Sequence, residues 1–367
     1  MRFVKAKYEI WEPKECNAKN ILEAIERAAK VCYKSEGNIK EGSALPFVKG
    51  LIKRGHTSCL EHGNIYLYVN QRKMYEYWNE HWEGNGKINP YVNFILKCRE
   101  TINITNTFSD YRISGKYIAN GDDPGEMYFY TNARFVYEKC PKLFWDIILE
   151  RELPNFIQLF TPKEDDPYRR QTVMFTADQR ITEEFLRHRI ASPNKESTRY
   201  CNYCSDKHNN ELTYIIPIRL NNIISDNDIP QQVFYGGALK WQCRNKFIED
   251  PAAQIILDEY SDTEKRYNTL VNIHQWRPEE ARILLNLGVK ADLILTNSLI
   301  DWCYGRPEPA DDYVPNIEDG EVQGKRIKGF FGLRTDSAAH PQARELAIPL
   351  MEDFKNRNWL IDEEKYR

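Results

Sequence analysis

One fourteen-residue segment, residues 187–200, constrains the fold of this chain more than any other part of the sequence. It reads Arg-His-Arg-Ile-Ala-Ser-Pro-Asn-Lys-Glu-Ser-Thr-Arg-Tyr and carries four basic side chains against one acidic one. Pro193 cannot continue a helix, so we expect the preceding helix to end near Ser192 and a loop with free backbone N–H groups to follow. Closely spaced arginines suit bidentate binding of phosphate or carboxylate oxygens. The segment therefore predicts an anion site that straddles a helix C-terminus and a loop.

The alternative for the same segment is a solvated basic loop whose arginines pair with acidic neighbours on the surface. Asn194, Ser197 and Thr198 place neutral hydrogen-bonding groups between the cations. This mixture favours a phosphate cradle, because phosphate oxygens accept from hydroxyl and amide donors as well as from guanidinium groups.

The composition limits the classes of protein to consider. The 367 residues are 41% hydrophobic and 29% charged, which is typical of a soluble globular protein. The net charge of −3 argues against general nucleic-acid affinity, so an anion site has to be a local cluster of cations. We find no apolar run of about 18–20 residues that would span a membrane, and the alternating N-terminus is unlike a signal peptide. The nine irregularly spaced cysteines predict reduced thiols and a cytoplasmic protein.

The hydrophobic pattern predicts both strands and helices and shows no internal repeat. Strands are expected at residues 4–10, 64–70, 172–177 and 213–217, and helices at 18–33, 44–54, 132–150, 230–248, 251–270, 278–287 and from Pro341 onward. Residues 291–296 fit either a strand or the start of a helix. The helix before the basic segment would be capped by Asp178 or Thr182, with Ile181, Phe185 and His188 on its inner face. Glu183 and Arg187 would form an exposed pair on that helix.

The basic segment resembles the signature of the flavin-dependent thymidylate synthases, which is Arg-His-Arg, seven residues, then Ser. Here Arg187-His188-Arg189 is followed after seven residues by Ser197, and the extended pattern is matched by Ser192, Asn194, Arg199 and Tyr200. Segments 55–62 (GHTSCLEH), 280–285 (EARILL), 330–334 (FFGLR) and 339–347 (AHPQARELA) resemble further motifs of that family, in the same order. The chain departs from the pattern at Glu184, Lys195, Ala338, His340 and Gln342.

The resemblance implies an α+β fold with a mixed or antiparallel β-sheet flanked by helices. Residues 1–70 and 171–367 would form the catalytic domain, and residues 71–170 an inserted subdomain. The insertion could cap the active site, extend an interface or bind a partner through Tyr75, Tyr77, Trp78 and Trp82. The same aromatic residues would also suit a small core of its own, outside the catalytic core, and we favour this interpretation.

The resemblance also implies the reaction, which is conversion of dUMP to dTMP with bound FAD, NADPH as reductant and methylenetetrahydrofolate as carbon donor. No enzyme nucleophile takes part, and Arg344 would activate the uracil ring by favouring its N3-deprotonated form. The expected dUMP contacts are Glu184, Arg187, Ser197, Thr198, Arg199, Arg282 and Arg344. The expected FAD contacts are His56, Ser58, Arg187, His188, Arg189, Lys195, Arg334 and His340. A homotetramer with shared active sites is expected as well.

Two other functions compete with this one. A nucleic-acid-binding protein would spread its positive charge along a face, which this chain does not do. A catalytically impaired relative that binds nucleotide or flavin as a subunit would explain the departures at Glu184, Lys195 and His340. Cys201, Cys204 and His208 could form half of a zinc site, but such a site needs a second pair of ligands, so no metal is expected. No Gly-x-Gly-x-x-Gly or phosphate-loop motif indicates a dinucleotide-binding unit or an NTPase.

Overall fold

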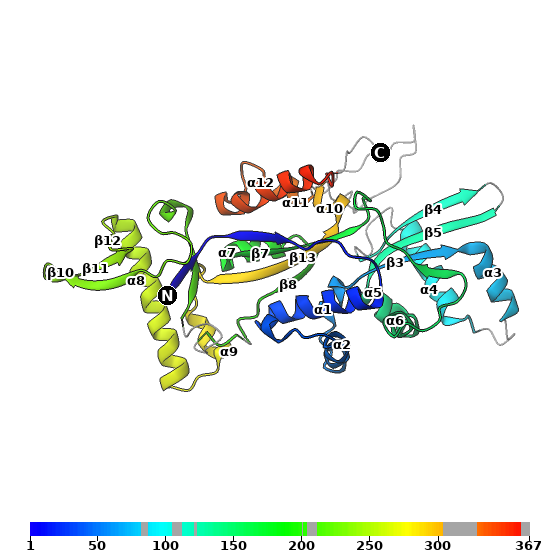
Figure 1. Ribbon diagram of the computed structural model, residues 1–367, viewed down its shortest axis with the longest axis horizontal. Coiled ribbons are helices and arrows are strands. Elements are labelled where there is room, and N and C mark those ends of the chain that lie inside the picture. The colour runs from blue at the N-terminus through cyan, green and yellow to red at the C-terminus, as the bar shows by residue number, and fades with distance from the viewer. Residues whose placement is uncertain are drawn as a thin grey trace.

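Two four-stranded sheets form the body of the computed structural model, which describes residues 1–81, 87–104, 112–120, 123–199, 201–203, 211–303 and 329–360 (Figure 1). The strand order is β4-β5-β3-β6 in the first sheet and β2-β7-β13-β8 in the second. A smaller unit around α8 lies at the opposite end of the molecule from the first sheet (Figure 1). The expected α+β class, with antiparallel sheets flanked by helices, is confirmed.

The second sheet is built on two long antiparallel strands, β7 (Arg170–Asp178) and β13 (Lys290–Ser298). Its edges are β2 (Lys7–Ile10) and β8 (Ser192–Lys195). One face is covered by α7 (Gln179–Leu186), α10 (Leu299–Cys303), α11 (Phe330–Arg334) and α12 (Pro341–Asn356). Because side chains alternate along a strand, Leu293 and Leu295 enter this core while Ile294 faces α1 on the other side.

The first sheet repeats this plan with β3 (Asn64–Asn70) and β5 (Asp123–Asn132) as its central antiparallel pair. Its edges are β4 (Ser114–Asn120) and β6 (Ile157–Leu159). The helices around it are α1 (Ala18–Cys32), α2 (Ala44–Lys53), α3 (Gln71–Glu80), α4 (Pro90–Ile104), α5 (Ala133–Lys139) and α6 (Pro141–Ile148). One buried cluster joins Ile21 and Leu51 to Phe129 and Leu143, so residues 71–170 share a core with the first 70 residues. The boundary expected at residue 70 falls at the end of β3, and the division into domains stays a prediction.

The third unit is held to the N-terminus by a parallel pairing of β1 (Arg2–Val4) with β9 (Thr213–Ile215). It contains β10 (Gln231–Tyr235), β11 (Ala238–Cys243), β12 (Lys246–Phe247), α8 (Pro251–Asn268), a π-helical turn (Thr269–Ile273), α9 (Pro278–Ala281) and a 3₁₀ turn (Arg282–Leu284). Phe3, Tyr214, Trp241 and Tyr267 form its core.

Most of the expected elements are present, and the exceptions occur at glycine and proline. The helix predicted over 230–248 is wrong, because Gly236 and Gly237 take positive φ angles of 60° and 83° and turn the chain into the β10–β11 hairpin. The helix predicted over 132–150 is two helices that meet at Cys140 and Pro141. The strand predicted over 4–10 is divided between two sheets, and residues 291–296 lie in a strand.

The loop predicted after Pro193 is also wrong. Helix α7 ends at Leu186, and Ser192–Lys195 is the edge strand β8, in which Pro193 lies opposite Leu295. An edge strand tolerates proline because one row of its backbone N–H groups makes no ladder hydrogen bond. Tyr200, Cys204, His208, Trp82 and the loop predicted over 304–326 lie outside the described residues. In the part of the chain that the structure describes, no helix is long and apolar enough to cross a membrane.

Candidate functional site

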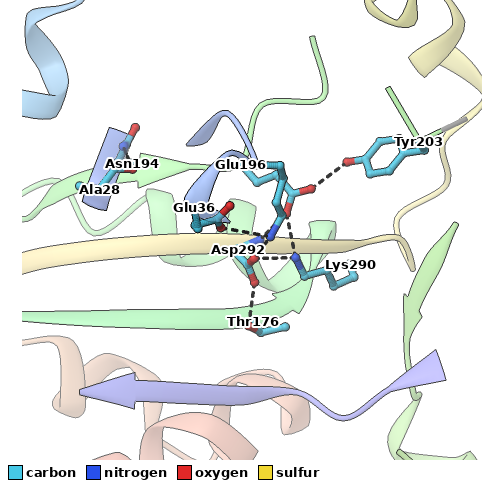
Figure 2. Close-up of polar contacts among 9 residues, drawn as sticks. Ala28, Glu36, Thr176, Asn194, Glu196, Tyr203, Lys290 and Asp292 are labelled. Atoms are coloured by element: carbon cyan, nitrogen blue, oxygen red, sulfur yellow. Dashed lines mark hydrogen bonds and ion pairs between the residues drawn. The ribbon is translucent and has the colours of Figure 1, made fainter. Parts of the chain in front are cut away.

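The basic segment is anchored at its centre by Asn194 and Glu196 (Figure 2). The amide of Asn194 donates to the carbonyl oxygen of Ala28 on α1 at 2.8 Å. The backbone N–H of Glu196 donates to the carbonyl oxygen of Asp292 at 2.7 Å. The segment is thus fixed to α1 on one side and to β13 on the other, just before Ser197.

Two buried carboxylates and two lysines form a charged network at this anchor (Figure 2). Lys290 Nζ lies 2.9 Å from Glu196 Oε2 and 2.6 Å from Asp292 Oδ2, and Lys34 pairs with the same two carboxylates. Thr176 donates to Asp292 at 2.7 Å. Burial raises the pKa of Asp292, but the charges of Lys290 and Lys34 outweigh this effect and hold that pKa below its usual value. Asp292 is therefore held in its ionised form between the two lysines.

The sequence analysis missed Lys34, Lys290 and Asp292 as part of the site. A signal for two of them was present, because Lys290 and Asp292 occupy alternate positions at the start of an otherwise apolar strand and so share one face. Lys34 carries no such signal, since it follows α1 and reaches the network only through the packing of α1 on the sheet.

The first group of predicted site residues lies directly after the anchor. Arg282 Nη1 donates to Thr198 Oγ1 at 3.2 Å, although the two residues are 84 positions apart. The backbone N–H of Ser197 donates to the carbonyl oxygen of Cys32 at 3.0 Å, and its Oγ accepts from the N–H of Arg199 at 3.3 Å. Arg199 and Arg282 are exposed to solvent. Two hydroxyls and two guanidinium groups in this arrangement can bind an anion.

A second group lines a cleft of about 580 Å³ next to the C-terminus of α7, bordered by Arg180, Glu183, Glu184, Arg187, Leu333 and Arg334. Arg334 donates through Nη1 to Glu184 Oε1 at 2.6 Å and through Nη2 to the Glu184 carbonyl oxygen at 2.7 Å. Its Nε is buried and has no hydrogen-bond partner in the part of the chain that the structure describes, and burial lowers the pKa of this guanidinium. Glu183 pairs with Lys195 at 2.5 Å, which joins β8 to this cleft.

A third group lies at the start of α12, on the same face of the second sheet as α7. His340 caps this helix, with Nδ1 accepting from the N–H of Gln342 at 3.1 Å. Arg180, which borders the cleft, donates to the side chain of Gln342 at 2.8 Å. Arg344 is half-buried, and its Nε has no hydrogen-bond partner among the described residues. Within the described residues, no side-chain hydrogen bond or ion pair joins Arg344 to Thr198 or Arg282.

The remaining predicted site residues differ in exposure. Ser58 and Arg189 are exposed, and His56 lies 2.7 Å from the hydroxyl of Tyr33 through Nδ1. His188 is only 4% exposed and packs edge-on against Phe330, and burial lowers its pKa to about 4. His188 is therefore a neutral residue of the core in this chain, and its contact with FAD stays a prediction.

Of the residues considered for a metal site, the structure describes Cys201. Burial raises the pKa of the Cys201 thiol to about 12, which disfavours the thiolate that zinc requires. No group of three or more potential metal ligands occurs among the described residues. Cys204 and His208 lie outside them.

Comparisons with known proteins give a match to a family model and a distant similarity to solved structures. The chain is similar to the crystal structure of a UMP/dUMP methylase, PolB from Streptomyces cacaoi, bound with 5-Br UMP. The identity is 11%, the TM-score is 0.34, and the alignment covers 97% of this chain and 92% of that one. No curated protein matches the sequence. Residues 170–304, which contain β7, the basic segment, Arg282 and β13, match the model of the Thy1 family, described as thymidylate synthase complementing protein.

Proposed function

We propose that the chain is a flavin-dependent thymidylate synthase, which methylates dUMP with methylenetetrahydrofolate as carbon donor and NADPH as reductant. The hydrogen bond between Arg282 and Thr198 carries this proposal. The family resemblance assigns both residues to dUMP, yet they come from segments 84 positions apart. Their contact supports a common ligand, since a hydrogen bond between two solvent-accessible side chains adds little stability by itself in water.

The phosphate of dUMP would bind to the group that follows the Glu196 anchor. Ser197 and Thr198 offer hydroxyls, and Arg199 and Arg282 offer guanidinium groups from two sides. Because Glu196 fixes the backbone just before Ser197, these groups would lose little conformational freedom on binding. Glu184 and Arg187 would contact the nucleotide from the cleft beside α7.

The residues around that cleft fit an FAD pyrophosphate. Arg187 and Arg334 place two guanidinium groups on one cleft, and the buried Arg334 Nε has no partner within the described chain. Guanidinium groups are the preferred donors to phosphate oxygens. His56, Ser58, His188, Arg189, Lys195 and His340 are the other proposed FAD contacts. Bound FAD would supply the hydride chemistry, so that no nucleophile from the chain is needed.

Arg344 is the proposed catalytic residue. Its half-buried guanidinium has an Nε without a partner among the described residues, and it lies in the first turn of α12, where the helix dipole adds positive potential. A fixed positive charge beside uracil would favour the N3-deprotonated ring. The arginine would act as an electrostatic stabiliser, since it does not give up its proton near neutral pH.

A homotetramer with shared active sites is part of the proposal. Large apolar side chains that are exposed in the single chain concentrate in the third unit, namely Ile229, Phe234, Tyr235, Leu239, Ile255, Ile273, Trp276, Ile283 and Leu287. Arg282 lies next to Ile283, which is 81% exposed. Apolar exposure of this extent favours association between copies.

The test is a visible spectrum of the purified protein, followed by NADPH oxidation and dTMP formation with and without dUMP. We expect a flavin spectrum and dTMP formation that depends on dUMP and methylenetetrahydrofolate. A protein that stays colourless after incubation with FAD would refute the proposal.

The alternative is a catalytically impaired relative that binds nucleotide or flavin as a subunit. One contact favours this alternative. The resemblance assigns the Arg334 guanidinium to FAD, but here it is hydrogen-bonded to the carboxylate of Glu184. Bound flavin without any dUMP-dependent turnover in the same assay would favour this alternative.

A further inference from the structure

A second cleft, with a volume of about 1040 Å³, opens between the first half of α1 and the segment that leads into β7. Trp11, His62, Tyr66, Arg169 and Arg170 are among the residues that line it. None of the residues proposed above to bind dUMP or FAD borders this cleft, so its chemistry is unexplained by the proposed reaction.

Arg169 is the most unusual residue of the cleft, because it is a buried cation that forms no ion pair with a carboxylate among the described residues. It is 3% exposed. Nε donates to the carbonyl oxygen of Glu164 at 2.8 Å, Nη1 donates to Gln171 Oε1 at 2.7 Å, and the guanidinium lies 4.5 Å from the ring centroid of Trp359. Nη2 is buried and has no hydrogen-bond partner among these residues. Burial lowers the pKa of this group although the charges of Glu164 and Asp166 raise it, so these carboxylates only partly offset the burial.

Two further buried nitrogens on the cleft have no hydrogen-bond partner among the described residues, Trp11 Nε1 and His62 Nε2. Trp11 is 7% exposed and His62 is 1% exposed. Most buried polar groups in folded proteins are paired, so the unpaired N–H groups of Arg169 and Trp11 on one cleft indicate a missing acceptor. The side chains of His62 and Trp11 are otherwise held in place, since His62 Nδ1 lies 2.8 Å from Thr296 Oγ1 and Arg27 lies over the Trp11 ring.

Three of the carboxylates that border the cleft pair with other cations. Glu12 accepts two hydrogen bonds of 2.8 Å from Arg357, Glu26 pairs with Lys30 at 2.8 Å, and Glu23 pairs with Lys14 at 3.1 Å. Glu15, Glu41 and Glu164 border the cleft as well, and Glu12, Glu164 and Asp166 attract Arg169 electrostatically. Since none of them forms an ion pair with Arg169 among the described residues, its Nη2 is left for a ligand. Apolar contact surface is available beside it from Ile21, Leu22 and Tyr66.

We propose that this cleft is a separate binding site for a small organic oxyanion, whose phosphate or carboxylate group accepts hydrogen bonds from Arg169 and Trp11 while its apolar part packs on Ile21, Leu22 and Tyr66. The cleft volume exceeds that of inorganic phosphate many times over, so the anionic group is one part of a larger ligand. The site lies outside the reaction proposed above and can exist whether or not that reaction occurs.

The test is isothermal titration calorimetry with inorganic phosphate and with benzoate at low ionic strength, in an Arg282→Gln background. That background removes an anion contact of the proposed dUMP site, so saturable binding that remains reports on the cleft. Tighter binding of phosphate would identify a phosphate ester as the ligand class, and tighter binding of benzoate would identify a carboxylate.

Adding Arg169→Gln is expected to weaken binding of the preferred probe about tenfold or more, because a charge-assisted hydrogen bond is lost. Trp11→Phe keeps the ring but removes its N–H, and about a threefold loss is expected. Lys19→Gln is the matched control, since it removes a positive charge from an exposed position that borders the same cleft, and binding should change less than about twofold.

The proposal is overturned if neither probe binds saturably, or if Arg169→Gln and Trp11→Phe both bind as tightly as the background protein. Trp11→Phe keeps the test decisive if circular dichroism shows that Arg169→Gln fails to fold.

Discussion

The two sheets share one construction and differ in the chemistry of a single face. Each has two long antiparallel strands that lead into capped helices, with Asn70 and Asn132 as caps in the first sheet and Asp178 as a cap in the second. In the first sheet the face opposite the apolar core is aromatic. The ring centroids of Tyr66 and Tyr130 on this face lie 5.8 Å apart. The same frame can therefore be completed by very different side chains.

In the second sheet the corresponding face is polar. It carries Thr172, Thr176, Asp292 and Thr296, whose hydroxyl and carboxylate oxygens are all hydrogen-bonded. A buried polar face contributes less to stability than an aromatic one unless every group is paired. The family match at residues 170–304 covers three of the four strands of this sheet and none of the first. The proposed functional groups thus lie near the sheet that has a polar face in place of an aromatic one.

The largest expected effect comes from breaking the network on the polar face. Lys290→Met leaves Glu196 and Asp292 with Lys34 as their single cation, and we expect the free energy of unfolding to fall by about 3–5 kcal/mol. Urea denaturation followed by circular dichroism measures this change.

The matched control on the aromatic face is Tyr68→Phe, which removes a hydroxyl that donates to Glu126 at 2.8 Å. We expect it to cost about 1 kcal/mol or less. If Lys290→Met and Tyr68→Phe lower the free energy of unfolding equally, the charged network contributes no more to stability than a single hydrogen bond on the aromatic face.

The second prediction concerns activity and follows from the proposed function. Arg344→Ala should keep bound FAD but lower dTMP formation by about 10²–10³-fold, because it removes a fixed charge beside the reacting ring. Arg72→Ala is the control, since Arg72 is exposed in the first turn of α3 in the first sheet. Flavin absorbance and product formation are measured for both. Unchanged turnover in Arg344→Ala would refute its catalytic role.

The local hydrophobic pattern of the sequence predicted the strands and helices around both sheets better than it predicted how they are arranged. The strand at 64–70 and the helices at 18–33 and 251–270 were predicted because their apolar periodicity is strong and their flanking residues agree with it. The edge strand at Pro193 was missed because its conformation depends on pairing with β13, which is about 100 residues away.

The shared plan of the two sheets was not visible as a sequence repeat. What recurs is a cap residue, any residue and an arginine at the strand–helix corners, as in Asn70-Gln71-Arg72, Asn132-Ala133-Arg134 and Asp178-Gln179-Arg180. Three residues are too few to stand out in one sequence. For the site, the spacing of the basic segment located Ser197 and Thr198, but only the fold shows that Arg282 reaches Thr198 and that Lys34 helps to anchor the segment.

The third prediction compares the histidines that follow α7 and α3. The folded-state pKa of His188 is about 4 because the ring is buried, whereas the ordinary value is 6.5. The unfolded chain therefore binds a proton more readily than the folded chain between these two values. Stability should fall as the pH decreases from about 6.5, by about 2 kcal/mol at pH 5 from this residue.

His188→Gln should remove that part of the pH dependence, as measured by urea denaturation at pH 7, 6 and 5. The control His81→Gln alters the exposed ring at the end of α3 and should leave the pH profile as it is in the unaltered protein. A pH profile of His188→Gln that matches the unaltered protein would show that His188 is not held neutral by burial.

The smallest effects on stability are expected at the helix N-caps, which occupy the corresponding strand–helix corners of the two sheets. Asn70 accepts from the N–H of Lys73 at 2.9 Å, and Asp178 accepts from the N–H of Ile181 at 2.8 Å. Alanine at either position should lower the free energy of unfolding by about 0.5–2 kcal/mol, because each change leaves one helix N–H without its acceptor. Comparable losses in urea denaturation would support equivalent corners in the two sheets. A loss of stability at Asp178 several times larger than that at Asn70 would contradict this. It would show that the corner of the second sheet depends mainly on the ion pair between Asp178 and Arg180. The corners of the two sheets would then be alike only in their backbone geometry.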